Sequence, residues 1–135
     1  MNNSELARIF ALYSKRDVKE GDWITVNDGV QNEYKELATR LLLENLEADI
    51  KLIPTELDLL NVMTKNSIDV KIRKVKISLI KNNTYDAGYR YIYDERFDDL
   101  SKAIGEAFLY LHNNKHLEVL KWVRQFVQYV KAKGK

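Results

Sequence analysis

Apolar side chains recur every three to four residues along most of the chain, and this period restricts the possible folds more than any other feature. Leu6, Ile9, Phe10 and Tyr13 share one face of a predicted first helix over about 4–16. A period near 3.6 belongs to an amphipathic helix that buries one stripe against a core. The sequence therefore predicts a chain built mainly from helices.

Two more helices follow at the same spacing. Asp28 precedes the longer one, predicted over about 30–50, as the N-cap of a capping-box pattern. Thr55 can cap a short third helix through about Thr64, because its hydroxyl can accept from a free backbone N–H group of the first turn. Residues 66–67 are its predicted end.

The last two predicted helices lie near the C-terminus. Acidic residues 98–99 suit the positive end of a helix dipole, and a fourth helix follows them until 113–114. A fifth is predicted over 116–133. Its apolar side chains fill an arc of about 120°, which predicts a buried face: Val119, Leu120, Val123, Phe126, Val127 and Val130. Its far side carries Lys121, Arg124, Gln128 and Lys131, and its border carries Trp122 and Tyr129.

The stretch IDVKIRKVKISLI, residues 68–80, fits two structures. It alternates as a strand with one slip in register, yet the apolar residues from Ile68 to Leu79 also share one helical face. Turn residues follow it, and Tyr89, Tyr91 and Tyr93 then fall on one side of a second strand, so a hairpin is the better prediction. The predicted fold class is mainly α: a small bundle of about five helices, with residues 68–93 as a β-hairpin or a further helix.

Length and composition place the chain among small globular proteins. Its 135 residues are expected to form a single domain over 1–135, and the absence of cysteine excludes a disulfide scaffold. Because no stretch approaches 18 apolar residues and the N-terminal region carries charges throughout, we expect no membrane span and no export signal. The expected location is the cytoplasm.

Positive charge is concentrated in two separate blocks. Residues 65–93 hold 7 basic and 2 acidic side chains, and residues 112–135 hold 6 and 1, a net charge of +5 in each block. If the blocks meet in the fold, they form the positive stripe typical of nucleic-acid binding. Alternatively, they pack beside the acidic blocks of the chain or bind a second copy.

The candidate contacts come from these two blocks. The candidate nucleic-acid-binding residues are Lys121, Arg124, Gln128, Lys131, Arg73, Lys74, Lys76 and Arg90. The candidate stacking or interface residues are Trp122, Tyr129, Tyr89 and Tyr91. Aromatic rings beside cations can stack on bases while the cations meet phosphates. The same composition also suits a protein contact, or a solvated face with snorkelling lysines.

Motifs of catalysis are absent from the sequence. It contains no GxxxxGK[ST], GxGxxG or GxSxG pattern. His112 and His116 have the i, i+4 spacing of a metal pair, but asparagines 113–114 are expected to break the helix between them. We therefore predict no catalytic residue, no metal ligand and no cofactor, and the chain is not expected to be an enzyme.

Part of the C-terminal segment resembles a known family. Leu120, Trp122, Val123, Arg124, Phe126 and a later Lys look like the closing helix of the small subunits of type III CRISPR effector complexes. TYDAGYR, residues 84–90, is similar to an aromatic-acid-Ala-Gly-Arg turn in another branch of that group. The resemblance implies an all-helical, non-catalytic subunit of an antiviral complex, stacked in several copies along the guide RNA and its target. It also implies that Lys121 and Arg124 contact the RNA backbone.

The predicted function is a non-catalytic binding subunit of a ribonucleoprotein complex. Its expected partners are RNA, as a guide or target backbone, and other subunits of the complex, with possible self-association and no membrane. The alternative is a protein-interaction module, such as a small viral or regulatory factor, that docks on a partner protein through the same aromatic and basic face.

Overall fold

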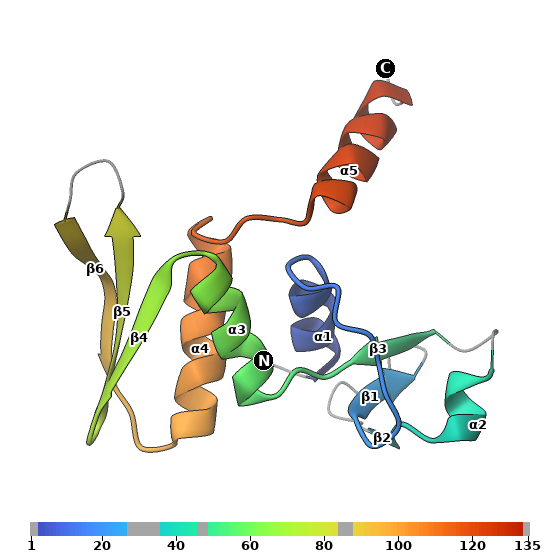
Figure 1. Ribbon diagram of the computed structural model, residues 1–135, viewed down its shortest axis with the longest axis horizontal. Coiled ribbons are helices and arrows are strands. Elements are labelled where there is room, and N and C mark those ends of the chain that lie inside the picture. The colour runs from blue at the N-terminus through green and yellow to red at the C-terminus, as the bar shows by residue number, and fades with distance from the viewer. Residues whose placement is uncertain (1–2, 27–35, 46–48, 84–87, 134–135) are drawn as a thin grey trace. The chain divides into compact units, whose positions relative to one another are not determined.

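The computed structural model describes residues 3–26, 36–45, 49–83 and 88–133 (Figure 1). Within these ranges the side chains of some residues, several of them in the last helix, are not described. The chain divides into two compact units. Unit 1 comprises residues 1–54 together with 119–135, and unit 2 comprises residues 55–118.

Unit 1 combines a small sheet with three helices. Its elements are α1 (Asn3–Ala11), β1 (Trp23–Val26), β2 (Glu36–Leu37), α2 (Arg40–Leu43), β3 (Ile50–Leu52) and α5 (Lys121–Lys133). The strands pair antiparallel in the order β2-β1-β3, and α1 packs against β1 and β3. Its core therefore forms where Phe10 of α1, Ile24 of β1 and Leu52 of β3 are buried.

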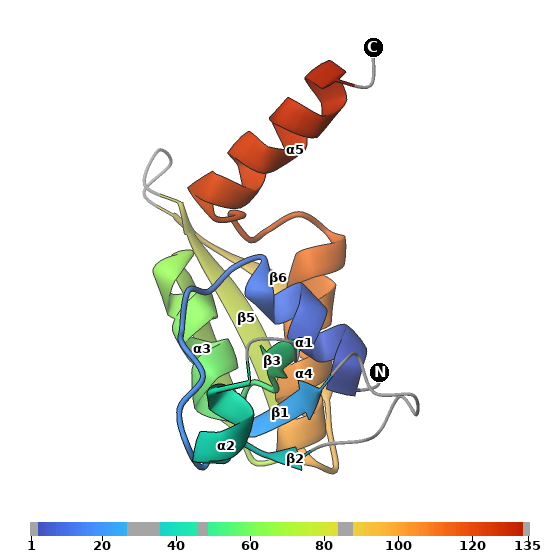
Figure 2. The same cartoon turned by 90° about the vertical axis from the view of Figure 1, so that its right-hand side faces the viewer.

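Unit 2 is a three-stranded sheet with two helices on one side (Figures 1 and 2). Its elements are α3 (Glu56–Lys65), β4 (Ile68–Arg73), β5 (Lys76–Asn83), β6 (Gly88–Arg96) and α4 (Leu100–Asn113). The strands form an antiparallel meander in the order β4-β5-β6. Both helices are amphipathic, so each needs an apolar surface to cover its buried stripe.

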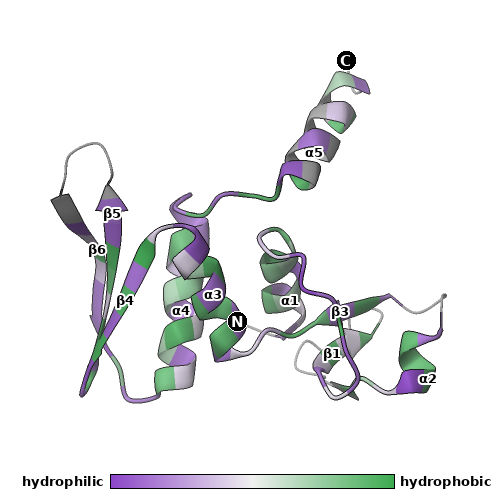
Figure 3. Ribbon diagram, in the orientation of Figure 1, coloured by the Kyte–Doolittle hydropathy of each residue, from purple (hydrophilic) through white to green (hydrophobic). Residues whose placement is uncertain are grey.

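The core of unit 2 lies between that sheet and its helices. Met63 of α3, Leu79 of β5, and Phe108 and Leu111 of α4 are completely buried. Each such side chain contributes roughly 1.5–3 kcal/mol through removal from water. Figure 3 shows hydrophilic and hydrophobic residues alternating along β4, as expected of a strand with only one face against a core.

The prediction of a mainly α, five-helix bundle is wrong, because the structure contains two antiparallel sheets. The largest error is the helix predicted over 30–50. Its described part holds β2, only the short helix α2 and the start of β3, while Asp28 lies outside the described residues. Leu37 and Leu41 have helical spacing, but they are 46% and 81% exposed. A continuous helix there would therefore gain little stability from burial of its apolar face. The all-helical fold that the family resemblance implied is not observed either.

The antiparallel pairing predicted within 68–93 is confirmed, but the single strand predicted over 68–80 is wrong, because the apparent slip in register is a turn between two strands. Arg73 and Lys76 face each other across β4 and β5, so residues 74–75 form a two-residue connection. Lys74 adopts a positive φ of 33° there, a conformation usually taken by glycine or asparagine. The stretch 68–80 is therefore two strands.

The tyrosines of β6 do not share one face as predicted. Tyr93 lies opposite Leu79 and Tyr91 lies opposite Ile80, so Ile92 is an extra residue in β6. Tyr93 consequently faces α4, with its ring 4.9 Å from that of Tyr110. Tyr91 is 57% exposed and occupies the other face.

The predicted helices of unit 2 are confirmed at both ends. Thr55 caps α3 and Asp99 caps α4, and each helix ends beside an asparagine whose side-chain amide donates 2.8 Å to a carbonyl of the last turn. The predicted first helix is confirmed over α1 only and is followed by a turn. The closing helix begins at Lys121 rather than 116, because the preceding backbone is bonded elsewhere: the N–H of Leu120 donates to the carbonyl of Leu12.

The apolar arc of α5 is not the buried face that was predicted. Val130 is 51% exposed, and Val119, Leu120 and Val123 are each partly exposed. The side chains of Phe126 and Val127 lie outside the described residues. Searched over its described residues, the chain has no helix whose length and apolar character would suffice to span a bilayer.

The cap of α3 gives the first prediction. The Thr55 hydroxyl accepts from the N–H of Asp58 at 3.2 Å, and the Asp58 carboxylate accepts from the N–H of Thr55 at 2.8 Å. Thr55→Ala removes half of this capping box and should lower the free energy of unfolding by about 1 kcal/mol. Urea denaturation measures the change. Thr64→Ala, at the exposed end of the same helix, is the matched control and should cost less; equal losses would contradict the cap.

A buried hydroxyl in unit 1 gives the second prediction. Thr25 of β1 is 1% exposed, and its Oγ1 has no hydrogen-bond partner among the residues that the structure describes. A buried hydroxyl without a partner costs roughly 1–3 kcal/mol in desolvation. Thr25→Val keeps the shape and β-branching and should raise the melting temperature. A lower melting temperature in calorimetry would show that the hydroxyl is satisfied.

Candidate functional site

The face of the β4-β5-β6 sheet that points away from α3 and α4 collects most of the charged strand residues. Leu79 and Tyr93 point toward the helices, so their alternate neighbours Ser78 and Asp94 point away. The cross-strand partners of these residues share that side. We call this side the outer face; it is defined by Asp69, Lys71, Arg73, Lys76, Ser78, Ile80, Tyr91, Asp94 and Arg96.

The charges of the outer face are unbalanced. It holds four cations and two carboxylates, a net charge of +2. Lys76 Nζ lies 2.8 Å from Asp94 Oδ2, and the Ser78 hydroxyl donates to Asp94 Oδ1 at 2.6 Å. Among the described residues, Lys71, Arg73 and Arg96 form no ion pair, so three cations of this face are not neutralised by neighbours.

Asp94 shows the effect of this positive surrounding. The hydrogen bond from Lys76 holds the pKa of its carboxyl below 3.8, with further contributions from the Ser78 hydroxyl and the charge of Arg73. Both ends of the Lys76–Asp94 pair are about half exposed, so the pair orients the lysine without burying it. A ligand with a stronger negative charge can therefore compete for Lys76.

One aromatic ring lies on the same face. Tyr91 is 57% exposed and stands opposite Ile80 on the central strand. An exposed ring beside a partly covered isoleucine is a surface on which a planar base can stack. The outer face thus combines the two kinds of side chain that the sequence analysis named, cations and a ring.

The structure gathers part of the predicted set on this face. Arg73, Lys76 and Tyr91 belong to it, and Lys74 lies in the turn next to Arg73. Arg90 does not belong to the outer face, because it lies opposite Lys81 on the side of the sheet that faces the helices. Two cations were missed: Lys71 and Arg96. The alternation Lys71-Arg73 could have revealed the first, but only the strand register brings Arg96 opposite Lys76.

The predicted residues of α5 are described only in part. Lys121 is exposed, and Tyr129 is exposed with Lys133 Nζ 4.8 Å from the centre of its ring. The following predicted contacts have side chains outside the described residues: Trp122, Arg124, Gln128 and Lys131, together with Tyr89 of β6. Since α5 belongs to unit 1, the meeting of the two basic blocks stays a prediction.

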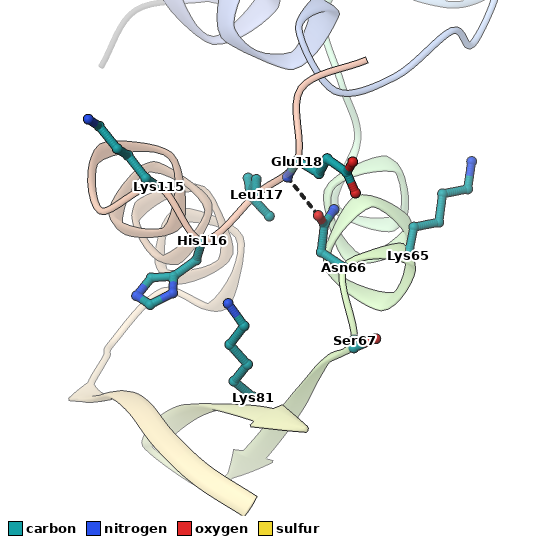
Figure 4. Close-up of a pocket in the computed structure, with 8 residues that line it drawn as sticks. All are labelled: Lys65, Asn66, Ser67, Lys81, Lys115, His116, Leu117 and Glu118. Carbon is teal, nitrogen blue, oxygen red and sulfur yellow. Dashed lines mark hydrogen bonds between the residues drawn. The ribbon is translucent and has the colours of Figure 1, made fainter. Parts of the chain in front are cut away.

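A second cationic feature of unit 2 is a pocket of about 340 Å³ where α3 and α4 end. Figure 4 shows Lys81 extending into it beside His116, while Lys65 and Lys115 point outward from its rim. The N–H of Glu118 donates to Asn66 Oδ1 at 2.7 Å across one side. In the parts of the chain that the structure describes, no cluster of three or more histidines and carboxylates could hold a metal ion.

The Lys76–Asp94 pair gives the third prediction. Asp94 has a lower pKa in the folded chain than in the unfolded chain, so its stabilising effect is present above pH 3.8 and is lost as the pH falls through the lowered value. Lys76→Gln should raise the pKa of Asp94 toward 3.8, as followed by NMR titration of its carboxyl carbon. Lys71→Gln removes a cation of the same face that does not bond Asp94; an equal shift there would contradict the direct pair.

Comparison with protein-family models, curated proteins and solved structures found no match to this chain. Function must therefore follow from the charges, rings and cavities described above.

Proposed function

We propose that the outer face of unit 2 binds single-stranded RNA along its backbone, without catalysis. The observation that carries the proposal is the group of unneutralised cations, Lys71, Arg73 and Arg96, on the same sheet face as the exposed ring of Tyr91. Cations that replace condensed counterions supply sequence-independent affinity, and an exposed ring adds stacking that every base can satisfy.

The dimensions of the face suit a short run of nucleotides. Three strands span roughly 10 Å across the sheet, and the distance along β6 from Arg96 to Tyr91 is roughly 16 Å. The cations occupy the end near the β4–β5 turn, where Lys74 adds another positive charge, and the ring lies toward the other end. Backbone contacts at one end and a stacked base at the other follow from this separation.

The sequence of the RNA is not expected to be read. Lysine and arginine dominate the outer face, and its polar groups Ser78 and Asp94 are already bonded to each other. Base-specific recognition needs donors and acceptors held in a fixed geometry against base edges, whereas long lysine and arginine side chains on an open sheet face suit phosphate contacts.

The proposal places this RNA contact within a larger ribonucleoprotein complex. Lys121 and Arg124 of α5 are proposed as a second backbone contact, with other subunits or a second copy of the chain as further partners. The outer face supports RNA binding independently of the family resemblance, whose implied all-helical fold the chain does not have.

The fourth prediction concerns the salt dependence of RNA binding. A fluorescently labelled oligouridylate, titrated at several salt concentrations, should give a falling line of log affinity against log salt concentration. Arg73→Gln with Arg96→Gln should make that slope shallower by roughly 0.7 per lost contact. Tyr91→Ala should weaken binding by about 1–3 kcal/mol with little change in slope, because stacking releases no counterion.

Two further variants sharpen the experiment. Asp94→Asn removes the carboxylate that occupies Lys76 and should strengthen RNA binding, since the lysine is then available to a phosphate. Lys102→Gln is the matched control: it removes one exposed cation from α4, on the other side of the sheet. The proposal fails if the wild-type chain shows no binding at low salt, or if the control weakens binding as much as the arginine pair.

A second candidate function is docking on a partner protein. Trp23 and Leu37 face each other across β1 and β2 of unit 1, and they are 42% and 46% exposed. Tryptophan is favoured at the centre of protein interfaces. An absence of RNA binding at low salt, combined with loss of a partner on Trp23→Ser, would favour this function over the first.

A further inference from the structure

The pocket at the ends of α3 and α4 collects positive charge that the outer face does not use. Lys65, Lys81 and Lys115 line it, with Glu118 as the only carboxylate of the lining. Arg90, the strand partner of Lys81, adds its charge from β6. Among the described residues, none of these four cations forms an ion pair. Like charges gathered in this way repel one another unless an anion lies between them.

The positive charge around the pocket also affects the pKa of His116. Partial burial, followed by the charges of Lys81 and Arg90, lowers its pKa below 6.5. Its ring lies nearly parallel to that of Tyr110, with centroids 6.2 Å apart, which restricts its orientation beside the pocket. At neutral pH the ring is therefore uncharged and offers one N–H donor to a ligand.

The carbonyl groups that end α3 and α4 lie beside this positive charge. Carbonyl groups at a helix C-terminus carry partial negative charge, but here several already accept hydrogen bonds. Asn66 Nδ2 donates to the carbonyl of Val62, and Asn114 Nδ2 donates to that of Tyr110, each at 2.8 Å. The N–H of His116 donates to the carbonyl of Leu111 at 2.9 Å.

Both helices also turn in the same way as they reach the pocket. Ser67 and Lys115, each one residue past the asparagine that caps its helix, have φ values of 59° and 58°. This left-handed conformation ends each helix sharply and brings a hydroxyl and a cation to the pocket rim. The rim is thus fixed by backbone geometry on two sides.

We propose that this pocket binds the phosphate group of a phosphate monoester, held by Lys81 and His116, while Lys115 and Lys65 at the rim add positive charge that attracts the anion. The pocket volume lies at the lower end of the range for small-ligand sites, so a nucleoside monophosphate is the largest ligand that we expect it to enclose. Its residues are separate from those of the outer face, so the two proposals can fail independently.

The fifth prediction uses the full chain and NMR titration of its backbone amides. Inorganic phosphate and uridine 5′-monophosphate should give saturable shifts at Ser67, Lys115 and His116, whereas uridine and chloride at equal ionic strength should not. Lys81→Gln should weaken both affinities about tenfold or more, because a charge-assisted hydrogen bond is lost.

Lys102→Gln serves again as the matched control, because it removes the same charge from an exposed position on α4 outside the pocket lining. The proposal is overturned if chloride produces the same shifts, or if this control weakens phosphate binding as much as Lys81→Gln does. A folded Lys81→Gln chain, judged by its amide spectrum, keeps the comparison valid.

The ring of His116 gives an independent readout. A bound phosphate should raise its pKa, since the anion offsets the charges of Lys81 and Arg90. The chain has only two histidines, so the two ring signals can be assigned with one substitution at His112. An unchanged pKa at saturating phosphate would exclude this site.

Oligouridylates with and without a 5′-phosphate identify the source of the monoester. A preference for the phosphorylated oligonucleotide that disappears in Lys81→Gln places the pocket at an RNA end. Equal affinities of the two oligonucleotides, together with binding of uridine 5′-monophosphate, point to a free small molecule.

Discussion

The burial of one face of the β4-β5-β6 sheet under α3 and α4 decides where the charged strand residues of unit 2 can lie. Leu79, Met63 and Phe108 fill the space between the sheet and the helices, and a lysine or arginine placed among them would lose its hydration. Strand alternation then sends most of the charges to the opposite side. The cationic outer face is thus the counterpart of a well-packed core.

The same constraint explains the position of the pocket. Beyond the last turns of α3 and α4 the helices no longer cover the sheet, and Lys81 can point to the helix side there without entering the core. Its cross-strand partner Ile68 is buried while Lys81 itself is only partly so. The boundary between apolar core and charged pocket therefore runs between two residues that face each other.

Local signals predicted unit 2 better than unit 1. Thr55, Asp99 and the asparagines that end α3 and α4 act through bonds to nearby backbone groups, so their roles could be inferred from the sequence. The strands of unit 1 pair between residues that are far apart in the sequence, as Ile24 and Leu52 are. No local sequence pattern predicts such a pairing. In the candidate site, Arg73 was named because it lies in a basic block of the sequence, but Arg96 required a register that only tertiary packing sets.

The extra residue in β6 has a consequence for the YIY sequence at 91–93. In a regular strand both tyrosines would have faced the same way, and one polar ring would have been forced into a mismatched environment. With Ile92 inserted, Tyr93 anchors the sheet to α4 while Tyr91 is left to solvent. Deleting Ile92 would give β6 a regular pairing with β5 and leave each tyrosine ring on its present side. A one-residue deletion should therefore be tolerated at this position and not at its neighbours.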